Sequence, residues 1–255
     1  MTFYLIGTGM NKNSIGADAL EILKTCDKIY LENYTVNFPY KIKDLKIKLT
    51  ELDRTKVEDE SILQEAKEKN VALLVYGDSL SATTHMQLVL ECKKQNIEYK
   101  IFHNASIMTA IAETGLQLYK FGKTTSMPNW KEHTNKPKSF ADIIKQNQSI
   151  KAHTLILTDI GLEIKEAITQ LQDTMKSTDS KESEATENLG FLGQESTEDF
   201  PEKIIVITNA GTENQKIFHD TPDNLKNQNI KMPFCLIIPS ELHFIEKEAI
   251  QELTK

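Results

Sequence analysis

The sequence contains little cysteine, a single arginine and no long apolar run, and each absence excludes a class of protein. The three cysteines, Cys26, Cys92 and Cys235, lie far apart in the chain. They are predicted to be reduced core thiols and not part of a disulfide framework or a metal site. No apolar stretch approaches the roughly 20 residues that a membrane helix needs. The first residues lack the basic leader and long apolar run of a secretory signal. We therefore expect a cytoplasmic protein that does not span a membrane.

The scarcity of arginine bears on the partners of the protein. Arg54 is the only arginine, so bidentate arginine recognition of bases or phosphates cannot be the main activity. The formal net charge is −7, but residues 177–199 hold seven acids against one lysine, which leaves −1 for the rest of the chain. A body this close to neutral lacks the basic field that nucleic-acid binding requires. We expect no direct nucleic-acid partner.

Residues 177–199 also differ from the rest of the chain in complexity. Fourteen of these 23 residues are Ser, Thr, Asp or Glu. Such a segment buries too little apolar surface to offset its ordering entropy, so the sequence predicts a mobile acidic loop.

The order of apolar patterns predicts an α/β fold. Strand-like runs at 3–7, 28–32 and 71–77 alternate with helical spacing at 17–26 and 84–94. This alternation is typical of right-handed crossovers and a mostly parallel sheet covered on both faces. After a helix expected at 106–118 the pattern restarts, with strands at 153–159 and 203–209, a strand from Phe234, a helix at 162–175 and a terminal helix. We place two α/β domains at 1–121 and 122–255.

Ligands of open parallel sheets bind beyond the carboxyl ends of the strands, so the residues after each strand are the candidates for chemistry. The loop Gly7-Thr8-Gly9 follows the first strand, and Glu32 ends the second, as in dinucleotide-binding folds. The third glycine of that motif is replaced by Lys12, so a tight turn explains the loop equally well, and no P-loop is present. Asp78 follows a buried strand and is either a ligand-binding carboxylate or a helix cap, and Ser106 has the same two interpretations.

The histidines and lysines give weaker signals. His85, His103, His153 and His243 are each isolated and lack the spacing of a zinc site, so no metal is predicted. Residues 120–145 carry a net charge of +4, which indicates a solvated face or a docking surface for an acidic partner.

Five motifs in order, YLIGTGM, GDSLSATTH, HNASIMTAIAETGLQLYKFGKT, HTLILTDI and PSELHFIEKEAI, span nearly the whole chain. Together they resemble the diphthine synthases, methyltransferases of diphthamide biosynthesis in the tetrapyrrole-methylase superfamily. The HNASI to YKFGKT block is the most specific of the five. Two departures from the usual pattern are present: Ser79 stands where the family has proline, and the glycine usual before the last Leu-His is replaced in Pro239-Ser240-Glu241-Leu242-His243.

The resemblance implies two α/β domains of the tetrapyrrole-methylase type with S-adenosylmethionine in the cleft between them, and a homodimer. It implies a protein substrate, translation elongation factor 2, at a histidine already carrying an aminocarboxypropyl group, with S-adenosylhomocysteine as the second product. It places the cofactor contacts on eight residues: Met10, Asp78, Ser81, Ser106, Ile107, Thr158, Ala210 and Phe234.

The chemistry that the resemblance implies needs no metal. A sulfonium already activates its methyl group, so we expect catalysis by orientation and desolvation, with no dedicated catalytic side chain. The chain length is more like that of the branch that transfers three methyl groups. Three alternatives stay open: a related enzyme acting on a corrin or on ribosomal RNA, a nicotinamide oxidoreductase built on the Gly7/Gly9 loop, and a silent scaffold that binds elongation factor through residues 120–145.

Overall fold

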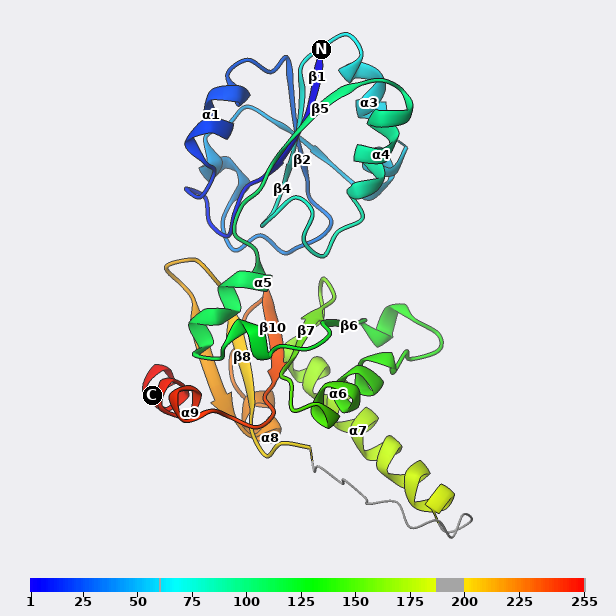
Figure 1. The fold of residues 1–255 in the computed structure, drawn as a ribbon, viewed down its shortest axis with the longest axis vertical. Helices are drawn as coiled ribbons and strands as arrows, with labels where there is room; N and C mark the ends of the chain where they lie inside the picture. The colour runs from blue at the N-terminus through cyan, green and yellow to red at the C-terminus, as the bar shows by residue number, and fades with distance from the viewer. Residues whose placement is uncertain (60, 187–199, 255) are drawn as a thin grey trace. The chain divides into compact units, whose positions relative to one another are not determined.

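The computed structural model describes residues 1–59, 61–186 and 200–254. The described chain forms two compact units (Figure 1). The first contains Met1–Ala110 and Ala210–Glu213, and the second contains Ile111–Asn209 and Asn214–Lys255.

The first unit is built on a five-stranded parallel sheet of order β3-β2-β4-β1-β5. Its strands are β1 (Thr2–Gly7), β2 (Lys28–Glu32), β3 (Thr50–Leu52), β4 (Val71–Val75) and β5 (Glu98–Phe102). Its helices are α1 (Ala17–Leu23), α2 (Arg54–Glu58), α3 (Ser61–Ala66) and α4 (Met86–Lys94), with the short 3-10 turn η1 (Ile42–Leu45). The predicted parallel sheet is confirmed for this unit.

Alternation along β1 explains why helices cover both faces of this sheet. Phe3 and Leu5 pack into one buried cluster with residues of α3 and α4, whereas Tyr4 and Ile6 pack into another with residues of α1. Successive strand residues point to opposite faces, so an uninterrupted apolar run is buried on both sides. Figure 1 shows α1 on one side of the sheet and α3 and α4 on the other.

The second unit contains a mixed sheet of order β6-β7-β10-β8-β9. Its strands are β6 (Thr125–Met127), β7 (Thr154–Thr158), β8 (Ile204–Thr208), β9 (Lys216–Asp220) and β10 (Phe234–Ile238). Only β6 and β7 pair in parallel, so a mostly parallel sheet is wrong for this unit. The short link from β8 to β9 has Asn209 at φ 50° and Gly211 at φ 75°. A connection this short can join only antiparallel neighbours.

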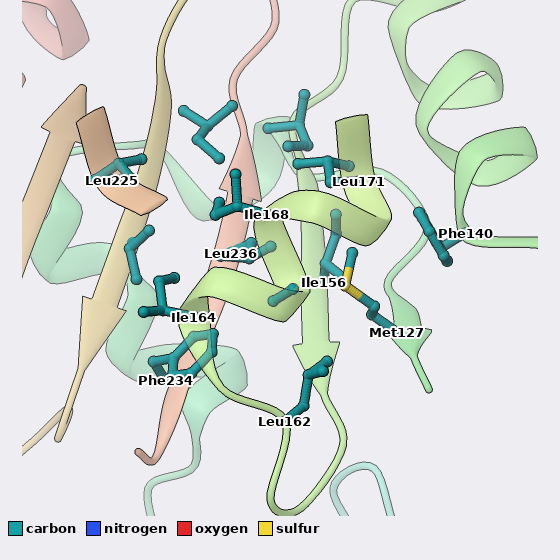
Figure 2. Close-up of a cluster of buried hydrophobic side chains, with 14 of the residues drawn as sticks. Met127, Phe140, Ile156, Leu162, Ile164, Ile168, Leu171, Leu225, Phe234 and Leu236 are labelled. Carbon is teal, nitrogen blue, oxygen red and sulfur yellow. The ribbon is translucent and has the colours of Figure 1, made fainter. Parts of the chain in front are cut away.

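Helices α6 (Ser139–Ser149), α7 (Ile164–Thr186), α8 (Pro222–Lys226) and α9 (Phe244–Leu253) complete the second unit. Figure 2 shows Ile164, Ile168 and Leu171 of α7 facing Ile156 of β7 and Leu236 of β10. These side chains follow the i, i+4, i+7 spacing of one helix face, which is why this stretch of the sequence buries itself on the sheet.

The division between the units falls at residues 110 and 111, about ten residues before the domain boundary expected from the sequence. The expected helix at 106–118 consists of α5 (Ile107–Ala110) and the 3-10 turn η2 (Ile111–Thr114), and the chain leaves it at Gly115. Because η2 packs against β8 and α9, the residues after Ala110 belong with the second unit.

The acidic segment is partly helical. Helix α7 continues to Thr186, so a loop over 177–186 is wrong, and the rest of the predicted loop, 187–199, lies outside the described residues. Residues 177–186 contain no glycine or proline, and extending an existing helix is much easier than starting one. Low complexity therefore does not prevent the helix from propagating.

Two predictions about side chains and membranes can be compared with the structure. None of the three cysteines, which all lie among the described residues, forms a disulfide bond; Cys92 and Cys235 are buried and Cys26 is half-buried. Among the described residues, none of the helices has the length and apolar character to cross a bilayer.

Candidate functional site

The loops after β1 and β4 lie against each other at the carboxyl edge of the first sheet. Gly9 N donates to Gly77 O at 3.0 Å, and Gly77 N donates back to Gly9 O at 3.1 Å. A Cβ added to Gly7 would lie 2.6 Å from Gly77 O, so only glycine permits this approach. The Gly-x-Gly motif is therefore explained by backbone packing between two loops, which supports the turn interpretation over the dinucleotide interpretation.

Asp78 is the centre of a hydrogen-bond network that joins the loops after β4 and β5. Its Oδ1 accepts from Leu80 N at 2.9 Å and from Ser81 Oγ at 3.2 Å. Its Oδ2 lies 2.9 Å from His103 Nδ1 and accepts from Asn104 N at 3.0 Å. Four donors occupy the roughly four lone-pair positions of a carboxylate. The cap interpretation for the following helix is wrong, because α4 begins after His85.

The same donors keep Asp78 ionised. Burial acts to raise the pKa of the Asp78 carboxyl, but the hydrogen bonds from Leu80 N, Asn104 N and His103 outweigh it and hold the pKa below its ordinary value. A negative charge is therefore held at the carboxyl edge of the sheet, with His103 exposed beside it.

Asn104, which follows β5, connects this network to β1. Its Nδ2 donates to Gly7 O at 3.0 Å and to Ser14 O at 2.8 Å. Ser106 follows, buried, and its Oγ accepts from Met108 N at 3.2 Å, which confirms the cap interpretation of this serine. Ile107, half-buried, is the first residue of α5.

Met10 lies against Gly211, the residue next to Ala210, although the two are far apart in the sequence. Gly211, at φ 75°, approaches so closely that an added Cβ would lie 2.4 Å from Met10 Cβ. The neighbouring Asn11 Nδ2 donates to Gly211 O at 2.9 Å. Residues 210–213 thus pack against the loop after β1 and belong to the first unit. No local sequence pattern predicts this long-range contact.

An aromatic cluster supports the Met10 loop and was missed by the sequence analysis. Tyr76 Oη donates to Met10 O at 3.1 Å. The ring centroids of Phe38 and Tyr40 lie 5.4 Å and 6.4 Å from that of Tyr76. Burial raises the pKa of the Tyr76 hydroxyl, with a smaller contribution from Tyr40, so this donor stays protonated. Aromatic residues scattered over a loop and a strand end carry no periodic signal.

Thr158 and Phe234 lie together in the second unit. Thr158 ends β7 and Phe234 begins the adjacent strand β10, and Thr158 Oγ1 donates to Phe234 O at 2.6 Å. Six of the predicted contact residues thus belong to the first unit and these two to the second. That a ligand occupies a cleft between the domains stays a prediction.

The other predicted titratable residues have different environments. His85 and Glu32 form a buried pair, so Glu32 is not placed to bind a ribose hydroxyl. His153 is buried against Glu246, and His243 caps α9. Within the described ranges, no three His, Cys, Asp or Glu side chains are grouped in a way that would hold a metal ion.

The comparisons with known proteins agree with this arrangement. The family described as Tetrapyrrole (Corrin/Porphyrin) Methylases matches residues 2–226. A diphthine synthase of Methanococcus maripaludis is 36% identical, over 98% of this chain and 97% of its own length. A diphthine methyl ester synthase of Bos taurus is 34% identical, over 98% and 94% of the two chains.

A solved structure of a diphthine synthase gives the same result for the fold. It superposes with a TM-score of 0.81 at 28% identity and covers 100% of this chain and 96% of that one. The resemblance to the diphthine synthases is therefore confirmed. The chain belongs to the tetrapyrrole (corrin/porphyrin) methylase family and is a methyltransferase with two α/β domains.

Proposed function

We propose that this chain is an S-adenosylmethionine-dependent N-methyltransferase of diphthamide biosynthesis. In this proposal it trimethylates the amino group of the aminocarboxypropyl-modified histidine of translation elongation factor 2, which gives diphthine. The names of the full-length relatives support the pathway. The observation that carries the site is the Asp78 network, which draws the loops after β4 and β5 together at the carboxyl edge of the first sheet.

The residues of this edge fit a cationic cofactor. Asp78 is held ionised by its hydrogen-bond donors, so it opposes a sulfonium by its charge, and it fixes the Leu80 backbone N–H and the Ser81 hydroxyl. The proposed cofactor residues are Met10, Asp78, Ser81, Ser106, Ile107, Thr158, Ala210 and Phe234. All the acceptor positions of Asp78 are occupied by protein donors. We therefore assign Asp78 an orienting and electrostatic role, and we assign the direct hydrogen bonds with the cofactor to neighbouring groups.

The protein contributes orientation and exclusion of water. S-adenosylmethionine, when bound, supplies a methyl group already activated on sulfur, and S-adenosylhomocysteine leaves. Well-oriented reactants lower a barrier by up to about 7–11 kcal/mol in the best model systems. The substrate amine must be neutral to attack, and an α-amino group with a pKa of roughly 7.7–8.0 is about one-tenth neutral at pH 7. Desolvation by the protein raises that fraction, so this proposal includes no general base.

The proposal extends to assembly and location, and one alternative substrate class remains. We expect a homodimer acting in the cytoplasm, with no metal. The alternative is a corrin or a ribosomal RNA substrate, and the family description, which names corrin and porphyrin methylases, supports the corrin. The near-neutral body of the chain makes RNA the weaker of the two.

The decisive experiment is the intact mass of elongation factor 2 bearing the aminocarboxypropyl-histidine, after incubation with this protein and S-adenosylmethionine. Three added methyl groups support diphthine formation. Four would instead assign the methyl-ester product that the name of the Bos taurus relative describes. An unchanged mass, with cofactor binding demonstrated separately, would contradict the proposal and direct the search to corrin and RNA substrates.

A further inference from the structure

A buried acid–histidine pair lies at the same edge of the first sheet as Asp78. Glu32 ends β2 and is 0% exposed, and His85 precedes α4 and is 2% exposed. Glu32 Oε2 lies 2.8 Å from His85 Nε2, and Thr35 Oγ1 donates to Glu32 Oε1. The 2.8 Å approach lacks hydrogen-bond geometry: within the described residues, Glu32 Oε2 and both imidazole nitrogens are without a hydrogen-bond partner. The attraction within a buried charged pair often does no more than balance the cost of removing both groups from water. The presence of this pair is therefore not explained by a contribution to stability alone.

The segment between Asp78 and His85 depends on side chains for its order. It contains no proline and no helix or strand. Ala82 adopts φ 56°, a left-handed conformation that a residue with a Cβ rarely takes. Ser79 Oγ is buried and has no hydrogen-bond partner among the residues that the structure describes. Local backbone preferences therefore do not explain the conformation of this segment.

Side chains hold both ends of the segment. At the first end, Asp78 accepts from Leu80 N and Ser81 Oγ. At the other end, Thr83 Oγ1 donates to Ser79 O at 3.3 Å and accepts from His85 N at 3.1 Å. The buried His85 ring in turn packs against the Glu32 carboxylate of β2, with 2.8 Å between Nε2 and Oε2. A continuous chain of contacts thus runs from β2 through His85 and Thr83 to Ser79, the residue next to Asp78.

We propose that the Glu32–His85 pair positions the Asp78–His85 segment for cofactor binding. The inference rests on the proposed function, because it assigns the pair a role in presenting Asp78 and Ser81 to S-adenosylmethionine. Glu32 and His85 are sealed from solvent, so neither touches the cofactor. They are positioning residues, and their removal loosens the segment and weakens cofactor affinity without removing a group that takes part in methyl transfer.

The test compares His85→Gln, Glu32→Gln and the double variant with the wild-type protein. Titration calorimetry with S-adenosylhomocysteine is expected to show affinity about tenfold weaker in each single variant. The KM for S-adenosylmethionine should rise in parallel, while kcat at saturating cofactor stays within about twofold. The double variant should bind no more weakly than either single one, because the pair acts as a unit. In the cofactor-free protein, amide hydrogen exchange over residues 78–85 should become faster.

The second unit offers a matched control in its own buried acid–histidine pair, His153 and Glu246. His153→Gln should lower the melting temperature comparably and leave the Kd for S-adenosylhomocysteine unchanged. An unchanged Kd in His85→Gln and Glu32→Gln, with only the melting temperature lowered, would overturn the proposal. Unaltered exchange over 78–85 would overturn it equally.

Two outcomes separate this proposal from neighbouring explanations. If the pair variants do not fold, Thr83→Val replaces them, because it removes only a half-buried hydroxyl. This variant must also bind S-adenosylhomocysteine more weakly than the wild type. An unchanged affinity in Thr83→Val would overturn the proposal. If the wild-type protein binds no S-adenosylhomocysteine, the proposed function has failed, and the exchange measurement alone decides whether the pair orders the segment. If the wild type binds and the variants bind equally well, only the positioning role has failed.

Discussion

His153 Nε2 lies 3.1 Å from Glu246 Oε1, and both side chains are entirely buried in the second unit. His153 Nδ1 accepts from Ser240 N at 3.0 Å, so the ring is neutral and its Nε2 carries the proton that Glu246 accepts. Glu246 also accepts from Gln117 N at 2.9 Å, His243 N at 2.8 Å and Lys120 Nζ at 2.6 Å. Lys120 is thus not part of a solvated lysine face. One ionised carboxylate thus joins the start of α9 to the turn at residues 117–120 and to His153.

This network predicts a loss of stability in acid. Burial acts to raise the pKa of Glu246, but the hydrogen bonds from Gln117, Lys120 and His243 outweigh it and lower the pKa to about 2. Its folded-state pKa is depressed, so its contribution is complete above the unfolded value and is lost as the pH falls below about 4.5. Burial also lowers the pKa of His153, so the neutral ring stabilises the fold above about 6.5 and that contribution falls below it. Urea unfolding from pH 7.5 to 3.5 should show both phases. His153→Gln should reduce the upper one, and the remainder belongs to His219, whose pKa is also lowered by burial.

The charge of Glu246 can be removed directly. Glu246→Gln keeps the shape but leaves Lys120 without its anion and two donors without acceptors, so we expect a loss of about 3 kcal/mol in unfolding free energy. Glu241→Gln is the matched control, because Glu241 pairs with Lys151 on the exposed surface. That variant should stay within about 0.5 kcal/mol of the wild type. Equal effects of the two substitutions would contradict the role assigned to Glu246.

Asp78→Asn should weaken S-adenosylmethionine binding by about 1.5–3 kcal/mol, measured by calorimetry. The amide lacks the negative charge and directs an NH₂ group at two of the present donors, so the loops after β4 and β5 lose a common acceptor. Asp53→Asn is a control in the same unit, because Asp53 caps α2 and asparagine caps helices as well. An affinity unchanged in Asp78→Asn would limit Asp78 to a purely structural role.

His103 tests whether the reaction needs a base. Its side chain is 68% exposed and its Nδ1 is held by Asp78, which is how proteins orient a catalytic imidazole. Catalysis by positioning predicts that His103→Gln keeps kcat within about threefold at saturating cofactor, with any deficit appearing in cofactor affinity. The same holds for His85 and His243. A collapse of kcat with unchanged affinity in any of the three would identify a base and reject the proposal.

Gly211→Ala and Gly161→Ala separate backbone strain from a specific clash. Both glycines have φ near 75°, so in both variants the left-handed conformation of alanine lowers the unfolding free energy by about 1–2 kcal/mol. Only at Gly211 does the added Cβ meet Met10, whereas at Gly161 it has no atom within 4 Å among the described residues. Gly211→Ala should therefore lose a further 1–3 kcal/mol or so in unfolding free energy, and also weaken cofactor binding. Chemical denaturation and calorimetry on the two variants measure these differences.

The sequence alone predicted the central strands of the first sheet and the faces that they bury. The continuous apolar run of β4 can be buried only between two layers, and the alternation of Phe3 and Leu5 with Tyr4 and Ile6 supplies both faces. A parallel sheet then places Met10, Asp78 and Ser106 at one edge, because parallel strands end on the same side. Periodicity is a property of neighbouring residues and needs no knowledge of distant ones.

Tertiary structure alone decided the contacts between residues far apart in the chain. The antiparallel insertion of β10 between β7 and β8 depends on strand pairing, which apolar runs of similar composition do not specify. The approach of Gly211 to Met10, and the pairing of Glu32 with His85, depend on how loops meet after the sheets have formed. The four donors to Asp78 come from residues up to 26 positions away. The complete occupation of its acceptor positions, on which the proposed orienting role depends, therefore follows from packing and not from a sequence motif.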